Sequence, residues 1–499
     1  MKLHKTRSTP AGSRGGSVVD WRLLPVVLIT ALGCHLLDIS NPDVVPVDVL
    51  GGATALAAVR AGAIGDFTIA YSGSGAGGSG GTVEGQIMVS GLLSDEWINT
   101  ETFPDRIQVD ARQTDPSSGT MANVFADLAR ARVSTENGAA QYRQFADSTK
   151  DGGLAELLSL NGFTYMMFGE NYCSGVPFSN ARADGSIQYG MPLTTLQMLD
   201  TAINRFNQAL AAAAAFDTSG ATAAARAPKV LARANAMALA RVGKARALLD
   251  EGRFADADTV ASAAGVTNGF VYVVQHDLNS SRQQNGVYNG DKKFKRYGVA
   301  DKEGGTGLAW ISVADPRNPV FRSPATNKGF DNATPQFDQY RYIDEKASVT
   351  VASGAEARLI NAEAALQRGD SAGMLGVLNA LRAAPPSYFL VGDLTLQTHT
   401  IAPLPALADS DRVNAGGAVN LLFNERARWL WLTAHRLNDL RRLVRAPGVR
   451  GGYGRAVNSV FPTGPYFKNG LTYGNDVNLP VPVTEQNNPN FSQCLDRLP

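Results

Sequence analysis

Two segments of this chain share the residue pattern of a helix, a turn and a second helix. Residues 240–260, ARVGKARALLDEGRFADADTV, align without gaps with residues 357–377, ARLINAEAALQRGDSAGMLGV. The shared residues include alanines of the first helix and the glycine of the turn, Gly252 in one copy and Gly369 in the other. Small residues let helices approach closely, and a repeated helix pair buries its apolar face only against its neighbours. The repeat therefore predicts a stacked array similar to tetratricopeptide repeats.

The sequence around the two copies completes the predicted fold. A helix is predicted over 194–215, where apolar residues recur at spacings of three and four. Its apolar face consists of Leu196, Leu199, Ile203, Phe206 and Leu210. Between the copies, one strand-like run, GFVYVVQH, is followed by polar stretches rich in Gly, Asp and Asn. We predict a mainly α fold, a tetratricopeptide-like helical superhelix with a loop-rich insertion containing short strands. Its parts are a helical region over 34–265, the insertion over 266–350 and a C-terminal helical region over 351–499.

The N-terminal segment has the order of an export signal. Basic residues precede an apolar run from Leu23 to Leu32, which has the length of a signal-peptide core and is too short to span a membrane. Residues 31–34, ALGC, resemble a bacterial lipobox in which the first two residues stand in swapped order. We predict that 1–33 are a signal peptide and that Cys34 is acylated after cleavage. The alternative is a free Cys34 thiol behind an ordinary signal peptide. No later stretch is expected to cross a bilayer.

The charge balance limits the kinds of binding partner to expect, and the number of cysteines limits the disulfide bonds. The chain has 46 Lys and Arg against 45 Asp and Glu, so a polyanionic partner such as nucleic acid is not expected. Besides Cys34 there are two cysteines, Cys173 and Cys494, both in loop-like sequence. An even number in an exported chain permits one bond in an oxidising compartment, and we predict a disulfide between them. The alternative is two buried thiols.

Signatures of catalysis are missing from the sequence. The five histidines are scattered without zinc spacing, and there is no G-x-S-x-G elbow or Walker loop. GSGAGG at 73–78 satisfies a dinucleotide-binding pattern, but it follows a helix-like segment, which favours a flexible loop. Asp95 and Glu96 beside Trp97 would suit a glycosidase only with a second carboxylate across a cleft. We therefore predict no enzyme, no metal and no cofactor.

The segment 424–444, NERARWLWLTAHRLNDLRRLV, is predicted as one amphipathic helix. Its polar face carries charges three or four residues apart, which is the spacing of ion pairs along a helix. The predicted pairs are Glu425 with Arg428, His435 with Asp439, and Asp439 with Arg442. This pattern is typical of a salt-bridged surface helix.

The same segment resembles the C-terminal part of the SusD/RagB-like family of outer-membrane nutrient-binding lipoproteins. Three other stretches resemble the family in the same order along the chain: CHLLDISNP at 34–42, EARLINAEAALQRGD at 356–370 and YGNDVNLPVPVTEQNNPN at 473–490. The resemblance implies a non-catalytic protein held by a lipid on Cys34 at the bacterial outer membrane and exposed at the cell surface. It also implies that the protein captures a nutrient, such as an oligosaccharide, for a SusC-like TonB-dependent transporter.

Two other function classes stay open, a secreted glycan or peptide hydrolase and a tetratricopeptide scaffold for envelope protein assembly. For nutrient capture, ligand contacts are expected in the irregular sequence over 276–332 and around Trp97, because loops on a rigid scaffold carry binding residues. The aromatic residues that would stack on a sugar are Trp97, Tyr288 and Trp310. The alternative for each of them is a place in the core.

Overall fold

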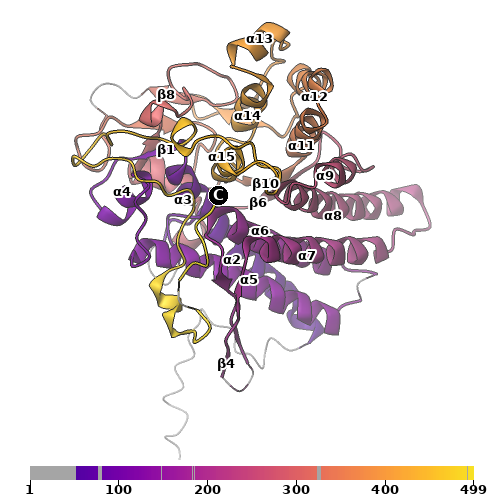
Figure 1. The fold of residues 1–499 in the computed structure, drawn as a ribbon. Helices are drawn as coiled ribbons and strands as arrows, with labels where there is room; N and C mark the ends of the chain where they lie inside the picture. The colour runs from indigo at the N-terminus through magenta and orange to yellow at the C-terminus, as the bar shows by residue number, and fades with distance from the viewer. Residues whose placement is uncertain are drawn as a thin grey trace, which may run out of the picture. The chain divides into compact units, whose positions relative to one another are not determined.

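The computed structural model describes residues 52–499, apart from 77–80, 148, 183, 185, 323–326 and 492. The predicted signal peptide and Cys34 lie outside the described residues. The described part is mainly helical, and its named strands form two-stranded antiparallel pairs. The predicted fold class, a helical array with a loop-rich insertion containing short strands, is confirmed (Figure 1).

The first part of the array is made of long helices that pack on one another in chain order (Figure 1). They are α2 (Leu56–Ser72), α5 (Gly119–Phe145), α6 (Gly153–Asn171), α7 (Thr195–Ala215) and α8 (Ala223–Asp250). All of α6 except Glu156 is buried, because its sequence is apolar on every side and helices cover it all round. The predicted helix over 194–215 is confirmed as α7, although Leu196 is exposed rather than packed.

The two repeat copies form neighbouring helix pairs. The first pair is α8 with α9 (Phe254–Ala261), and the second is α11 (Gly354–Gln367) with α12 (Ser371–Ala383). Both turn glycines adopt the left-handed conformation, with φ of 77° at Gly252 and 80° at Gly369. A side chain at either position would strain that backbone, which explains the shared glycine. Since α9 packs on α11, the copies stack directly and the predicted repeat is confirmed.

The insertion starts and ends at one strand pair. The predicted strand is β6 (Val271–Val274), which pairs antiparallel with β10 (Val349–Ser353). The elements between them are η3 (Ser281–Gln283), α10 (Gly286–Tyr288), the π-helical turn η4 (Asn289–Lys293), β7 (Tyr297–Val299), η5 (Glu303–Gly305), β8 (Val320–Arg322) and β9 (Phe337–Gln339). Because β7 pairs with β1 (Trp97–Asn99), the insertion is fixed to the N-terminal part of the chain.

Smaller elements connect these parts. The loop that carries GSGAGG joins α2 to α3 (Gln86–Leu93), as predicted, and α4 (Pro104–Asp110) follows β1. One hairpin of two nested strand pairs projects from the array, and a second hairpin lies beyond α12. Their strands are β2 (Val176–Pro177) with β5 (Pro192–Leu193), β3 (Asn180–Ala181) with β4 (Ile187–Gln188), and β11 (Leu390–Gly392) with β12 (Thr398–Thr400). The short helix α13 (Asp409–Asn414) leads into the C-terminal region.

The prediction of one continuous surface helix over 424–444 is wrong. The segment forms α14 (Ala418–Trp429) and α15 (Arg436–Val444), with a break between them. Leu432 and Ala434 have φ of 55° and 59°, a conformation that no α-helix contains. The break turns the chain inward, so the charged face of both helices packs against the protein rather than facing water.

A buried ion network takes the place of the expected surface pairs. The carboxylate of Asp439 accepts hydrogen bonds from Arg426 at 2.8 and 2.9 Å and from Arg442 at 2.7 Å. Arg442 also contacts Glu363 of α11, so the network joins the C-terminal helices to the second repeat pair. Burial opposes ionisation of Asp439, but the two guanidinium groups outweigh it and lower the pKa of Asp439 below its usual value.

Of the three predicted pairs, only Asp439 with Arg442 is present. Glu425 and His435 both turn to residues far away in the sequence, because their side chains point into the protein. The partners found instead are Arg317 and Arg382 for Glu425, and Glu356 for His435.

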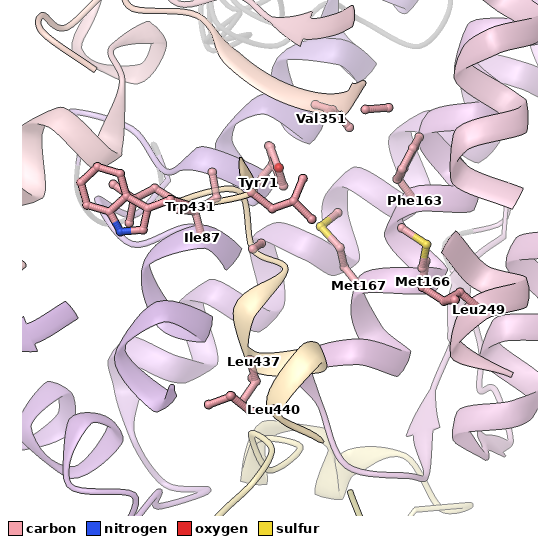
Figure 2. Packing of buried hydrophobic residues seen from close by; sticks show 14 of the residues in the cluster. Tyr71, Ile87, Phe163, Met166, Met167, Leu249, Val351, Trp431, Leu437 and Leu440 are labelled. Carbon is pink, nitrogen blue, oxygen red and sulfur yellow. The ribbon is translucent and has the colours of Figure 1, made fainter. Parts of the chain in front are cut away.

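One large core connects the array, the insertion and the C-terminal helices. Figure 2 shows side chains from six different segments meeting there: Tyr71, Ile87, Met166, Leu249, Val351 and Trp431. The Oη atom of Tyr71 lies 2.9 Å from the backbone oxygens of both Thr350 and Thr433. The core therefore fixes the insertion at its base to the rest of the protein.

The residues Ala53–Ser72, which include α2, are long and apolar enough to cross a membrane by length and composition, contrary to the sequence-based expectation. In the structure the second half of α2 lies inside the protein. Phe67, Ile69 and Tyr71 are all buried in it.

Cys173 and Cys494 form a disulfide in the structure, with their Cα atoms 5.8 Å apart. Cys173 lies two residues after the end of α6, and Cys494 belongs to the last residues of the chain. The backbone N–H of Leu495 also donates to the oxygen of Ser174 at 2.8 Å. The C-terminal segment is thereby held against the end of a buried helix.

Candidate functional site

The structure does not allow Trp97 or Trp310 to contact a ligand. Trp97 is 0% exposed and Trp310 is 1% exposed. Trp310 stacks on Trp431 at a centroid distance of 5.9 Å, and its Nε1 donates to the backbone oxygen of Asp95 at 2.6 Å. Neither ring has a free face, so the prediction that these two tryptophans stack on a sugar is wrong.

Tyr288, the third predicted aromatic residue, lies at the end of α10 and is partly exposed. The ammonium group of Lys292 lies 5.9 Å from its ring centroid. Burial and the nearby carboxylates of Glu345 and Asp344 raise the pKa of Tyr288. The structure leaves its hydroxyl protonated at neutral pH, and its role as a ligand contact stays a prediction.

A cleft of about 450 Å³ lies where three irregular segments meet. We call it the Phe467 cleft. Its lining consists of Glu101, Thr102, Ile107, Asp331, Ala333, Thr334, Pro335, Phe467, Lys468 and Asn469. Residues 101–102 follow β1 and Asp331 belongs to the insertion, so two regions predicted to bind a ligand do meet here. They contribute different residues from those predicted, and the third segment, 467–469, was not predicted at all.

The polar groups of the cleft are held in fixed positions. Lys468 Nζ donates to Asp331 Oδ2 at 2.8 Å, to the backbone oxygen of Glu101 at 3.0 Å and to Asn99 Oδ1 at 3.5 Å. Asp331 also accepts from Thr334 Oγ1 at 2.6 Å. Burial opposes ionisation of Asp331, but the hydrogen bonds from Lys468 and Thr334 outweigh it and lower the pKa of Asp331 to about 2.

An aromatic ring forms one wall of the cleft. Phe467 is 47% exposed, although phenylalanine is more often buried. Its ring lies 4.5 Å from that of Tyr466, whose hydroxyl donates to Asp110 at 2.6 Å. Two further exposed phenylalanines, Phe103 and Phe330, adjoin lining residues in the sequence. The fold therefore holds an open phenyl face beside the polar groups.

The support beneath Phe467 contains two buried carboxyl groups. Tyr466 and Tyr473 donate to Asp110 and Glu303 respectively, at 2.6 and 2.9 Å. Burial raises the pKa of Asp110 to about 6, and it raises the pKa of Glu303 well above its usual value, with Asp110 adding to that rise. Both carboxyl groups are therefore harder to ionise than exposed ones.

A second cavity, of about 550 Å³, lies between β8 and the hairpin of β11 and β12. Its walls are largely apolar and include Pro319, Phe321, Tyr340 and Ile401. Its few polar groups lie in the hairpin, where His399 is 3.8 Å from Asp393. Asp393 accepts hydrogen bonds from Thr395 and Gln397 of the same hairpin, whereas the polar groups of the Phe467 cleft come from three separate segments.

Sequence reasoning missed the segment 465–470, PYFKNG, although it held a signal. Two adjacent aromatic residues followed by Lys, Asn and Gly without helical or strand periodicity indicate a loop with exposed rings. Among the described residues, no group of three or more His, Cys, Asp or Glu is arranged to hold a metal ion.

No protein-family model matches the chain, and neither does any curated protein. Solved structures match over most of its length. A SusD superfamily protein from Bacteroides fragilis is 14% identical with a TM-score of 0.58, and the match covers 88% of this chain and 99% of that one. A laminarin-binding SusD-like protein is 13% identical, with a TM-score of 0.58 and coverage of 89% and 99%.

A SusD/RagB family protein from Bacteroides thetaiotaomicron is 13% identical with a TM-score of 0.54, and the match covers 80% of this chain and 90% of that one. Structural similarity at such low sequence identity establishes the fold alone. The chain therefore has the fold of the SusD/RagB-like proteins, as the order of its sequence motifs predicted.

Proposed function

We propose that this chain is a non-catalytic lipoprotein of the bacterial outer membrane, which captures an oligosaccharide in the Phe467 cleft and delivers it to a TonB-dependent transporter. The observation that carries the proposal is the open ring of Phe467 beside polar groups already fixed by hydrogen bonds. Sugar rings stack their C–H faces on aromatic side chains, and their hydroxyls need oriented partners. The fold adds support, since one protein that shares it binds laminarin.

The charges of the cleft favour a neutral sugar. Lys468 has three donors, and all of them have acceptors in Asp331, Glu101 and Asn99. The carboxylate of Asp331 is neutralised in turn by Lys468. An anionic ligand would find no free cation among the residues that line the cleft, whereas hydroxyl groups can bond to Thr102 and Asn469. We therefore infer an uncharged oligosaccharide as the ligand.

Replacing Phe467 by Ala is expected to lower oligosaccharide affinity about tenfold, because the stacking surface is lost. The melting temperature should change little, since half of the ring is already in water. Titration calorimetry with laminarin and a panel of neutral oligosaccharides measures the effect. Phe145→Ala, at the exposed end of α5, is the matched control and should bind like the unchanged protein. Equal affinity of both variants would place the ligand elsewhere, and release of reducing ends would favour the hydrolase.

A separate experiment tests the lipid anchor and the association with a transporter. We expect the protein to co-purify with a TonB-dependent barrel from detergent-solubilised outer membrane, and mass spectrometry to find an acylated Cys34 at its N-terminus. An unmodified Cys34 contradicts the anchor. Recovery of envelope proteins without a barrel, together with no affinity for any sugar, would favour the scaffold alternative.

A further inference from the structure

One side of α8 carries many positive charges and no acidic residue. Between Asp217, which precedes the helix, and Asp250, which ends it, the chain has no Asp or Glu. Residues spaced three, four or seven apart share one side of a helix. One side of the helix carries Arg226, Lys229, Val230, Arg233, Met237, Arg241 and Lys244, which we call the α8 cationic face. Of these, Arg226 and Val230 are exposed and the others are partly exposed. The whole chain has a net charge of only +1, so this concentration is local.

The first half of α8 extends beyond the core of the protein. Its buried residues begin only at Ala238, and the start of the helix reaches the edge of the molecule in Figure 1. Two apolar side chains stand in water on this half, Val230 at 51% exposed and Leu231 at 61% exposed. A helix with basic and apolar side chains together on its exposed surface has the composition of a helix that lies on a bilayer.

The cations of this face are poorly neutralised. Arg233 and Lys244 have no hydrogen bond or ion pair to any other residue that the structure describes. Arg226 donates to the backbone oxygen of Gly220, and Lys229 to that of Ser219. Among the described residues, the acid that forms an ion pair with this face is Asp217, whose carboxylate is 3.6 Å from Lys229 Nζ, and Arg241 donates to the backbone oxygen of Ala264. The neighbouring last turns of α7 contain only alanine and leucine.

We propose that the α8 cationic face binds the phosphate-bearing surface of a lipid bilayer and thereby sets the orientation of the protein on the membrane. Phosphate groups would pair with the arginines and lysines, while Val230 and Leu231 enter the layer of headgroups. The exposed apolar side chains favour a bilayer over nucleic acid, which would offer phosphates without an apolar phase to enter. The proposal rests on the membrane location proposed above.

The path of the chain agrees with this orientation. Leu56, at the start of α2, belongs to the same apolar cluster as Leu210 and Ala212 in the last turns of α7. The backbone N–H of Asp217 donates to the oxygen of Thr149 at 2.7 Å, which ties the start of the α8 region to the loop after α5. The described body therefore begins at the same end at which α8 begins.

Vesicle sedimentation tests the proposal. The protein starting at residue 34 would carry Cys34→Ser, so that no acyl chain contributes to binding. We expect it to sediment with vesicles of phosphatidylcholine and phosphatidylglycerol but not with phosphatidylcholine alone. The variant with Arg226→Glu and Arg233→Glu should lose at least tenfold in partition coefficient, because each basic residue near an anionic bilayer contributes roughly a fivefold factor. Val230→Ser with Leu231→Ser should also weaken binding.

The control variant carries Arg182→Glu and Lys346→Glu, two exposed sites off the helix with the same total change of charge. It should bind vesicles as strongly as the protein without charge-reversing substitutions. An equal loss in the control would show that net charge alone attracts the protein, and binding to duplex DNA but not to vesicles would identify the other polyanion; either result overturns the proposal. Calorimetry on the same samples measures their affinity for laminarin. It therefore separates a loss of vesicle binding from a loss of sugar binding.

Discussion

Replacing Asp439 by Asn is expected to lower the free energy of unfolding by about 3–5 kcal/mol. The substitution keeps the shape of the side chain but removes one of the two carboxylates that Arg426 and Arg442 share, so that only Glu363 remains as a countercharge for both. Removing one member of a buried ion network costs more than the pair itself contributes, since the remaining charges stay desolvated. Denaturant unfolding followed by circular dichroism measures the loss.

The chain contains a matched control for this variant. Asp409 and Arg412 have the same spacing as Asp439 and Arg442 and the same closest approach of 2.7 Å, but Asp409 is 71% exposed. Asp409→Asn should change the free energy of unfolding by less than about 1 kcal/mol, as exposed ion pairs do. Similar losses in the two variants would show that burial of the network is not what makes Asp439 important.

The pH dependence of the stability follows from the same ion network. The pKa of Asp439 is lower in the folded protein than in the unfolded chain, so its stabilising contribution is fully present above about pH 4. The contribution is lost as the pH falls from there toward the folded pKa. The difference in stability between the unchanged protein and Asp439→Asn should therefore shrink in acid.

Replacing Trp310 by Ala should cost about 3–5 kcal/mol of stability and leave sugar affinity unchanged in the molecules that remain folded. The indole is fully buried, stacks on Trp431 and donates a hydrogen bond to Asp95, so its removal opens a cavity and strands a buried carbonyl oxygen. Thermal unfolding and calorimetry with laminarin measure the two quantities separately.

Trp310→Phe keeps most of the apolar volume and should lose a smaller part of the stability. If Trp310→Ala instead weakens sugar binding while the protein melts at its usual temperature, the ring is accessible in solution and the Phe467 cleft is not the main site.

The helical array could be predicted because its signals are local. Gly252 and Gly369 mark turns that need a left-handed residue, and the alanines beside them mark close helix contacts. The helical spacing along α7 correctly predicted that Leu199, Ile203 and Phe206 pack against the protein. Leu196 does not, because it lies in the first turn of the helix, at the end of the packed face.

The C-terminal region shows where local patterns fail. Charged residues at helical spacing are typical of a solvated face, and nothing within 424–444 reveals that a guanidinium from α15 meets Glu363, which lies far away in the chain. Similarly, the sequence around an aromatic residue in a polar stretch does not show whether its side chain is buried. Trp97 and Trp310 are buried because β1 pairs with β7 and because Trp431 turns inward, and both contacts join residues more than a hundred positions apart.

The candidate site was predicted by region rather than by residue. Irregular sequence around Trp97 and within 276–332 does reach the Phe467 cleft, through Thr102 and Asp331. The ring itself comes from the end of the chain, and only the tertiary fold brings it to the other two segments.

The disulfide changes what a protease can do to this protein. Cys173 and Cys494 are 321 positions apart, so a single cut at any exposed loop between them leaves two pieces that are still covalently joined. The hairpin of β11 and β12 and the link between α7 and α8 are exposed loops of this kind. A nicked copy would keep both pieces together and would migrate as one chain on a gel until a reductant is added.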